Sequence, residues 1–185
     1  MKAIETPIPG VLIIESDIYT DERGSVTPAW IADDFQALGL PVVFGQCNIV
    51  RNHRRGTLRG LHYQQDPFSE VKLIRALHGS IFDVAVDLRP DSPTYCRWTA
   101  IELRAGEPRM FYLPRGIAHG YQTLEDQAEV MYFVSPKYSG KHQRGVRWDD
   151  PVFAIKWPIS PPVVIHPRDA AYPDFVSSAL RQSAR

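Results

Sequence analysis

The stretch "VKLIRALHGSIFDVAVDLR", residues 71–89, decides the fold class. Apolar side chains recur in it with the period of two that is typical of β-strands, and "HGS" in its middle supplies a glycine for a turn. Alternate positions from Phe82 to Leu88 form an apolar face, whereas Asp83 and Asp87 lie on the opposite face. Two carboxylates in a central strand are costly unless they meet donors or water. We therefore expect this second face to border the mouth of a barrel that holds water and ligand.

The same alternation recurs in seven further segments, at 10–16, 42–50, 57–64, 98–105, 109–114, 119–124 and 128–135. Segments rich in Gly, Pro, Asn and Asp separate them, as turns require. One helical pattern, at 31–40, has an apolar stripe of Ile31, Phe35 and Leu38 and a stop at Gly39. These patterns predict an all-β protein, a β-sandwich or barrel with a few short helices.

We expect one domain, 1–185, because no repeat, low-complexity tract or linker divides the chain. A chain of 185 residues is long enough to bury one core. The proline-rich segment 156–185 is predicted to be an irregular tail that packs on the barrel without joining its sheets.

The composition excludes several classes of partner. The 21 basic and 21 acidic side chains cancel, so no overall field attracts nucleic acid or an anionic membrane. No apolar run approaches the ~20 residues that a membrane span needs, and the N-terminal stretch lacks the pattern of a signal peptide. Cys47 and Cys96 are too few to build a disulfide framework. We expect a soluble, cytoplasmic protein that binds neither nucleic acid nor membrane.

Two of the strand segments each carry a histidine. "TLRGLHYQ", residues 57–64, contains Arg59 and His62, which a regular strand would point to opposite faces because they are three apart. Gly60 between them predicts a β-bulge, which would turn both side chains to one concave face. Alternatively, Arg59 is a solvated edge residue and His62 a hydrogen-bonded core histidine. His119 follows the apolar run in "FYLPRGIAHGYQ", residues 111–122.

Three other side chains are candidates for chemistry. Lys72 shares its strand face with Ile74, so its ammonium either holds a phosphate or carbonyl in a pocket or reaches solvent at the rim. Tyr132 lies on an apolar face, where most tyrosines only pack. Asp169 lies in the tail, and a carboxylate that reaches His62 would fix the tautomer of the ring and raise its basicity.

The motifs G-x-S-x-G, P-loop, G-x-G-x-x-G and the spacing of structural zinc sites are all absent from the sequence. However, "PRGIAH", residues 114–119, has the Pro-x-Gly-x-x-His form of metal-binding cupin barrels. A metal site would combine His62 and His119 with Gln64 or Glu70, a marginal ligand set. A metal-dependent cupin oxygenase or isomerase is therefore an alternative, although we expect no metal or other cofactor.

Taken together, these segments resemble the dTDP-4-dehydrorhamnose 3,5-epimerase family. The resemblance rests on "DERG" (21–24), "LRGLHYQ" (58–64), "KLIRALHGSIFDVAVDLRPDSPTY" (72–95), "YLPRGIAHGYQTL" (112–124), "RGVRWDDP" (144–151) and "PRDA" (167–170). It implies a cupin-type jelly roll without metal, a nucleotide-sugar substrate, and a homodimer in which a strand from each subunit helps to shape the other's site.

The resemblance also implies roles for individual residues. His62 is the general base, Asp169 its hydrogen-bond partner, Tyr132 the general acid, and Lys72 the group that stabilises an enolate oxygen at C4. The implied substrate contacts are Arg59 and His119 in the sugar pocket, Arg23 and Arg168 at the diphosphate, and Gln46, Asn48, Tyr138 and Gln143 at the nucleotide.

Several positions depart from the family pattern. Pro28 and Gln143 stand where many members carry glutamates, Phe133 replaces a lysine, and Cys47 replaces an acidic residue. The resemblance places Pro28, Gln143 and Phe133 beside the nucleotide or the pocket, so these departures affect the identity of the nucleotide and sugar more than the type of reaction.

The implied reaction inverts C3 and C5, or one of them, of a nucleotide-linked 4-keto-6-deoxyhexose through an enolate. The implied conversion is dTDP-4-dehydro-6-deoxyglucose to dTDP-4-dehydrorhamnose. A non-catalytic sugar-nucleotide-binding barrel is a further alternative, for which His62 and Tyr132 need not face each other.

Overall fold

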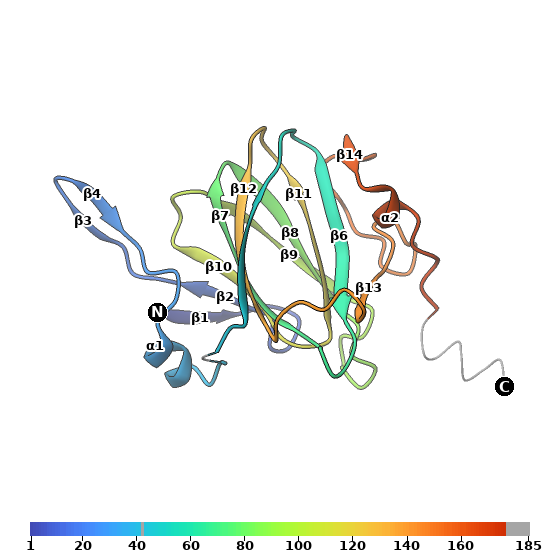
Figure 1. The fold of residues 1–185 in the computed structure, drawn as a ribbon, viewed down its shortest axis with the longest axis horizontal. Helices are drawn as coiled ribbons and strands as arrows, with labels where there is room; N and C mark the ends of the chain where they lie inside the picture. The colour runs from blue at the N-terminus through green and yellow to red at the C-terminus, as the bar shows by residue number, and fades with distance from the viewer. Residues whose placement is uncertain (42, 177–185) are drawn as a thin grey trace.

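The computed structural model describes residues 1–41 and 43–176 (Figure 1). Two antiparallel sheets pack face to face. The first sheet has the order β1 (Lys2–Glu5), β2 (Leu12–Glu15), β10 (Arg109–Leu113), β7 (Val71–His78), β12 (Glu129–Ser135), β5 (Gln46–Arg51). The second has the order β13 (Gln143–Gly145), β6 (Thr57–Gln64), β11 (Ile117–Thr123), β8 (Ser80–Asp87), β9 (Trp98–Arg104). The predicted jelly-roll sandwich is therefore confirmed.

The stretch 71–89 forms the link between the two sheets. Its first half is β7, in the first sheet, and its second half is β8, in the second sheet. Gly79 joins them with φ +65°, a conformation that glycine adopts without steric cost. The chain therefore changes sheets at this turn, and β11 and β12 repeat the crossing by pairing with β8 and β7 respectively.

The core between the sheets contains Ile81 and Ala85 of β8, packed with Ile74 and Phe111 of the first sheet. The alternate positions of β8, such as Val84, face outward, yet they are also buried. A second cluster covers them with side chains from the segment that follows β13, including Phe153 and Trp157. Both faces of β8 are therefore buried, which explains why its sequence is apolar at most positions.

The predicted helix is confirmed as α1 (Ala32–Ala37). Phe35 is fully buried against the outer face of the first sheet, where it packs with Leu73 and Met110. The helix ends at Gly39, whose φ of +71° is the left-handed conformation of a helix C-terminus. No helix in the described ranges is long and apolar enough to cross a membrane.

The tail is more ordered than predicted. Val164 and Ile165 form β14, which pairs in parallel with β6, and α2 (Pro167–Ala170) follows directly. The tail therefore joins the second sheet, contrary to our expectation, because the two-residue strand "VI" pairs with the edge of β6 that β13 leaves open. Residues 177–185 lie outside the described residues, so the full extent of the domain 1–185 stays a prediction.

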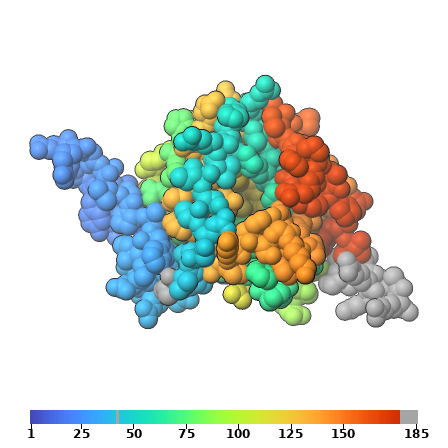
Figure 2. Space-filling view, viewed as in Figure 1, coloured from blue at the N-terminus to red at the C-terminus, as the bar shows by residue number. Residues whose placement is uncertain are grey.

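A short hairpin, β3 (Tyr19–Asp21) and β4 (Gly24–Val26), projects from the body of the molecule (Figure 1, Figure 2). All of its residues are exposed, including the apolar side chains of Tyr19 (62%) and Val26 (67%). A hairpin that exposes apolar side chains on both strands gains little from its own fold.

Candidate functional site

A cavity of about 610 Å³ lies between the sheets. Its lining includes Gln46 and Asn48 of β5, Arg59 and His62 of β6, Lys72 of β7, His119 of β11, Tyr132 of β12, Tyr138, Gln143 of β13, and Arg168 and Asp169 of α2. In Figure 2 the segments that border it, β5 and β6 (cyan), 135–145 (orange) and the tail (red), lie side by side on one face. Eleven of the twelve predicted site residues therefore line one cavity.

The β6 bulge predicted at Gly60 is confirmed. His119 pairs with His62 and Tyr121 with Arg59, so β6 takes three steps where β11 takes two. Gly60 has φ +124°, and a Cβ there would lie 2.5 Å from the Cα of Gly120. The extra residue turns Arg59 and His62 into the same cavity, as a bulge does when it re-aims its neighbours.

His62 pairs with the buried carboxylate of Asp169. The ring Nε2 lies 2.8 Å from Oδ1 of Asp169, and the other carboxylate oxygen accepts from the Gly60 amide at 3.2 Å. This fixes the tautomer, because Nε2–H must donate to the carboxylate and Nδ1 then carries the lone pair. Among the described residues, Nδ1 has no hydrogen-bond partner, so it is available to a ligand.

Burial lowers the pKa of His62 below its usual value, and Asp169 offsets part of this effect. Burial by itself raises the pKa of Asp169, but hydrogen bonds from His62 and Gly60 outweigh it and hold that pKa below its usual value. A neutral imidazole beside an ionised carboxylate is the state that a general base requires at neutral pH.

His119 belongs to a second pair of the same kind. Its Nε2 lies 2.6 Å from Oδ1 of Asp83, which is fully buried in β8. Within the described residues, Oδ2 of Asp83 is buried and has no partner. The cavity lining includes His119 but neither Asp83 nor Asp87, so the expectation that this face of β8 borders the cavity was wrong. Asp83 instead meets a donor, His119, which the alternation pattern did not pair with it.

Lys72 is 7% exposed, so its ammonium does not reach solvent at the rim. Nζ lies 2.9 Å from Oε1 of Glu70 and 3.4 Å from the backbone oxygen of His62. The lysine enters from the first sheet and contacts a strand of the second. This places a cation in the cavity lining, in contact with the backbone of the residue that is the candidate base.

Tyr132 enters the cavity from β12, in the sheet opposite to the one that carries His62. Burial raises the pKa of Tyr132, and the charge of Glu70 adds to the rise. The phenol therefore keeps its proton at neutral pH, as a general acid must.

Polar groups at the predicted nucleotide end are linked to each other. Gln46 Nε2 donates to Asn48 at 2.7 Å, and Gln46 Oε1 accepts from the Tyr138 amide at 3.3 Å. The Tyr138 hydroxyl donates to Gln143, which also accepts from Arg168 at 3.4 Å. Five predicted binding residues therefore form one hydrogen-bonded network along the cavity.

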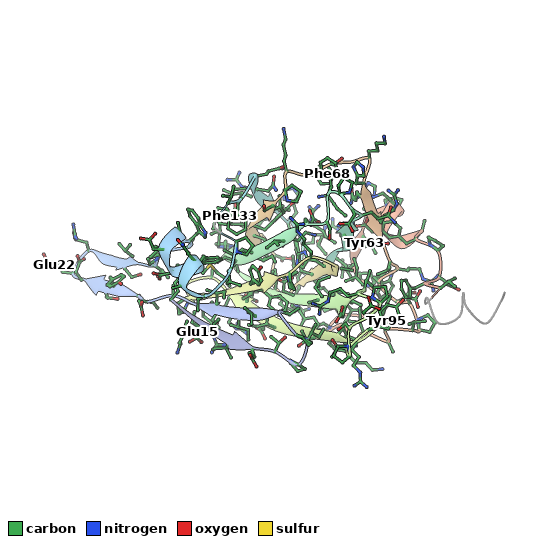
Figure 3. The ribbon with its side chains drawn as sticks, turned by 90° about the horizontal axis from the view of Figure 1, so that it is seen from below. Glu15, Glu22, Tyr63, Phe68, Tyr95 and Phe133 are labelled. Carbon is green, nitrogen blue, oxygen red and sulfur yellow. The ribbon has the colours of Figure 1, made fainter. Side chains whose placement is uncertain are left out.

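Arg23 is the predicted site residue that the cavity lining does not contain. It lies at the tip of the β3–β4 hairpin and donates to Asp21, with Nη2 at 2.5 Å from Oδ2. Figure 3 shows Glu22, its neighbour in the chain, at one end of the molecule and well away from Tyr63 of β6. Within one chain, Arg23 therefore does not reach the site.

Phe133, which stands where the family has a lysine, packs on the outer face of the first sheet (Figure 3). Its ring centroid lies 5.3 Å from that of Phe44. Since the cavity lining does not include it, this departure leaves the sugar pocket unchanged.

The four candidate metal ligands each have a different partner. His62 bonds to Asp169 and His119 to Asp83, whereas Gln64 and Glu70 bond to each other and Glu70 to Lys72. In the described ranges, no three His, Cys, Asp or Glu side chains are grouped so that they could hold a metal ion.

Two residues have contacts at the site that were not predicted: Glu70, which the sequence suggested only as a candidate metal ligand, and Asn52. Glu70 precedes β7 in a polar segment that resembles a turn, and Asn52 lies in the turn-rich segment after β5. The Asn52 side chain accepts from Arg59 Nε at 2.8 Å and donates to the Ala128 carbonyl at 3.0 Å. A buried polar residue in a loop gives no periodic signal, so sequence alone could not predict that Glu70 pairs with Lys72 or that Asn52 bonds to Arg59.

Comparison with known proteins gives consistent matches. The family model for dTDP-4-dehydrorhamnose 3,5-epimerase matches residues 5–177. The dTDP-4-dehydrorhamnose 3,5-epimerase of Shigella flexneri is 41% identical over 165 residues, which cover 89% of this chain and 91% of the relative.

Solved structures agree. The dTDP-4-dehydrorhamnose 3,5-epimerase of Bacillus anthracis, with TDP and PPi bound, has a TM-score of 0.90 and 38% identity, covering 94% of this chain and 99% of the other. The 3,5-epimerase of Legionella pneumophila in complex with dTDP-4-keto-L-rhamnose has a TM-score of 0.87 and 38% identity, covering 92% and 90%.

These matches decide against an oxygenase and against a non-catalytic barrel, and they confirm the activity class that the sequence predicted. The chain belongs to the dTDP-4-dehydrorhamnose 3,5-epimerase family and is a carbohydrate epimerase with a cupin-type jelly-roll fold.

Proposed function

We propose that this chain inverts C3 and C5 of a dTDP-linked 4-keto-6-deoxyhexose, converting dTDP-4-dehydro-6-deoxyglucose to dTDP-4-dehydrorhamnose. One observation carries the proposal: His62 and Tyr132 come from opposite sheets into a single cavity that also contains Lys72. Inversion needs a base and an acid on opposite sides of the sugar ring, and two facing sheets supply them.

Proton removal is the first step. Nδ1 of His62 takes the proton from the carbon next to the C4 ketone, and the electrons of the C–H bond move to the C4 oxygen as an enolate. The Lys72 ammonium stabilises that oxygen, since fixed charge at a developing oxyanion typically contributes several kcal/mol. Asp169 keeps the ring in the correct tautomer and stabilises the imidazolium that forms.

Proton delivery completes the inversion. The Tyr132 hydroxyl gives its proton to the same carbon from the opposite face, and the enolate collapses to the ketone. One proton leaves and one arrives, so the step is balanced without an oxidant or reductant. Solvent then takes the proton from His62 and returns one to Tyr132, after which the same steps at the second carbon invert the other centre.

The nucleotide and diphosphate bind along the remaining cavity lining. Arg168 faces the diphosphate, and Tyr138 offers an aromatic ring to the base, with its hydroxyl held by Gln143. Gln46 and Asn48 supply amide groups for the nucleotide. The conversion takes place in the cytoplasm, consistent with two free thiols, Cys47 and Cys96.

The enzyme acts as a homodimer in which the β3–β4 hairpin enters the partner's site and places Arg23 at the diphosphate. Two features support this assembly. The hairpin exposes Tyr19 and Val26 while projecting from its own subunit, and the outer face of the first sheet exposes Ile49 (61%) and Leu77 (40%). Exposed apolar side chains of this kind are typical of an interface.

Solvent exchange tests the function. The protein is incubated with dTDP-4-dehydro-6-deoxyglucose in D₂O, and deuterium at C3 and C5 is followed by NMR. We expect deuterium at both carbons and a product with both centres inverted. Exchange at one carbon would establish a mono-epimerase, and no exchange would refute the proposed reaction.

Two variants test the roles of base and acid in the same assay. His62→Ala should lower exchange by about 10²- to 10⁴-fold, the usual contribution of a general base. Tyr132→Phe should retain exchange but lose inversion, because the proton can still leave but cannot be returned to the opposite face. Tyr112→Phe is the matched control, since this buried tyrosine lies on the outer face of the first sheet.

A further inference from the structure

Glu70 is the buried carboxylate of the cavity to which the mechanism above gives no role. It is 7% exposed and lies just before β7, two residues from Lys72. Oε1 lies 2.9 Å from Nζ of Lys72, and Oε2 accepts from Gln64 Nε2 at 2.8 Å. Both oxygens are therefore used, each by a different side chain of the cavity lining.

The hydrogen-bond directions in this chain of contacts are fixed by its ends. Oε1 of Gln64 lies 2.6 Å from the Ser139 amide, which can only donate, so the amide group of Gln64 must point its NH₂ at Glu70. Lys72 at the other end can also only donate. Glu70 must accept on both sides, and of the common side chains of this shape only an ionised carboxylate does so.

The Lys72 ammonium, at one end of this series of hydrogen bonds, has one N–H left for the substrate. An ammonium has three N–H groups, and in the described structure Nζ has two partners, Glu70 and the His62 carbonyl. The four-carbon stem of lysine rotates freely about its bonds, so the direction of the third N–H depends on those two partners. A buried ammonium without a counter-charge is also costly.

We infer that Glu70 is a positioning residue: it holds the Lys72 ammonium in place to stabilise the enolate oxygen, and through Gln64 it joins that ammonium to the segment that carries Tyr138. The inference rests on the proposed function, because it assumes that Lys72 meets the C4 oxygen. It adds a connection between the two ends of the cavity that the proposed function does not include. The nucleotide end and the reacting end of the cavity are joined by Ser139, Gln64, Glu70 and Lys72 in turn.

Glu70→Gln is the sharpest test, since it keeps the shape of the side chain but replaces one acceptor with a donor. The new NH₂ must face either Lys72 or the NH₂ of Gln64, and both are donors. We expect kcat to fall about 10- to 100-fold, as for other residues that orient a functional group, with KM nearly unchanged. Wild-type kcat in this variant would overturn the inference.

A double-mutant cycle separates positioning from general damage. If Glu70 acts through Lys72, then Glu70→Gln should cost about twofold or less in a Lys72→Ala background. An equal loss in both backgrounds would mean that Glu70 acts on something else, and the inference would be wrong. If Glu70→Gln does not fold, Glu70→Asp, which keeps the charge but shortens the reach, enters the same cycle.

Controls distinguish this inference from the proposed function and from loss of stability. The wild-type exchange assay tests the proposed function alone, so an inactive wild type refutes that function before any variant is made. Asp150→Asn is the matched control for stability: this buried carboxylate accepts from the Val152 and Phe175 amides, away from the cavity lining. It should lower the melting temperature and leave kcat unchanged.

Discussion

The cavity and the β3–β4 hairpin each hold a carboxylate paired with a basic side chain, and the two pairs differ in how firmly they are held. Asp169 is 2% exposed and bonds to His62, the Gly60 amide and Arg168. Asp21 and Arg23 pair in solvent at the tip of the hairpin. Each pair lowers the pKa of its carboxyl, Asp169 against the opposing effect of burial and Asp21 mainly through Arg23.

The difference lies in what each pair can do next. Water and salt compete with an exposed ion pair, so Arg23 can leave Asp21 for a stronger anion at little cost. His62 cannot leave Asp169 in this way, because the carboxylate is buried and bonded from two sides. The cavity is thus built to hold one geometry, and the hairpin is free to bind elsewhere.

The largest expected effect tests whether the hairpin completes a partner's site. Arg23→Glu and His62→Ala should each lower kcat/KM by about 100-fold or more, the first by repelling the diphosphate and the second by removing the base. If Arg23 acts in the partner's site, a hybrid dimer of the two variants has one intact site. Mixed subunits that assemble at random should then recover about a quarter of wild-type activity, as expected for a twofold-symmetric dimer.

The outcome is read from activity of the mixture after denaturation and refolding together, against each variant refolded alone. Size-exclusion chromatography with light scattering shows whether dimers form. A mixture no more active than its components would mean that Arg23 acts within its own chain or not at all. The hairpin would then not complete a partner's site.

Two glycines give a matched test of how closely the two regions are packed. Gly60 and Gly24 have nearly the same φ, +124° and +129°. A Cβ on Gly60 would lie 2.5 Å from Gly120, whereas a Cβ on Gly24 would meet nothing within 4 Å. Both alanine variants carry backbone strain, but only Gly60→Ala must also displace its neighbour.

We expect Gly60→Ala to lower the free energy of unfolding by about 2 to 5 kcal/mol, the sum of strain and overpacking. Gly24→Ala should cost about 1 to 2 kcal/mol at most, because strain acts alone there. Urea denaturation followed by tryptophan fluorescence measures both. Equal losses would show that crowding at the bulge contributes nothing.

The parts of this site that the sequence predicted are those set by neighbouring residues in the chain. Period-two alternation placed Lys72 and Tyr132 on the cavity side of their strands, and Gly60 located the bulge. These features are local, since each is set by the few residues around it. The fold class was predictable for that reason.

What could not be predicted depends on contacts between distant segments. Strands of two to four residues, such as β1, β13 and β14, are too short to show a period. The bonds from Asp83 to His119 and from Glu70 to Gln64 depend on strand register and loop path, which the alternation pattern does not encode. Arg23 was assigned to the site by resemblance, and a single chain does not bring it there.

The smallest expected effects come from replacing each carboxylate with an amide. Asp169→Asn removes the charge that raises the pKa of His62, so that pKa falls further below its usual value. Lys72 and Arg168, the other charged neighbours, both act in the same lowering direction. The acid limb of kcat/KM reports protonation of the free base, so it should move to lower pH while kcat falls about 10- to 100-fold.

Asp21→Asn should change neither the melting temperature nor the acid limb. The lowered pKa values of Asp169 and His62 both make the fold less stable as the pH falls, but over different pH ranges. A carboxyl pKa that is lower in the folded state stabilises the fold at pH values above the pKa of the unfolded state. This stabilisation is lost as the pH falls through the pKa of the folded state. A histidine pKa that is lower in the folded state makes the fold less stable as the pH falls below about 6.5, the pKa of the unfolded state.

Wild type should therefore lose stability in two stages on acidification, and Asp169→Asn should lack the stage at lower pH. Melting temperatures from pH 8 to pH 3 distinguish the stages, and an Asp21→Asn profile that departs from wild type would show that the hairpin pair is not merely a solvent-exposed contact.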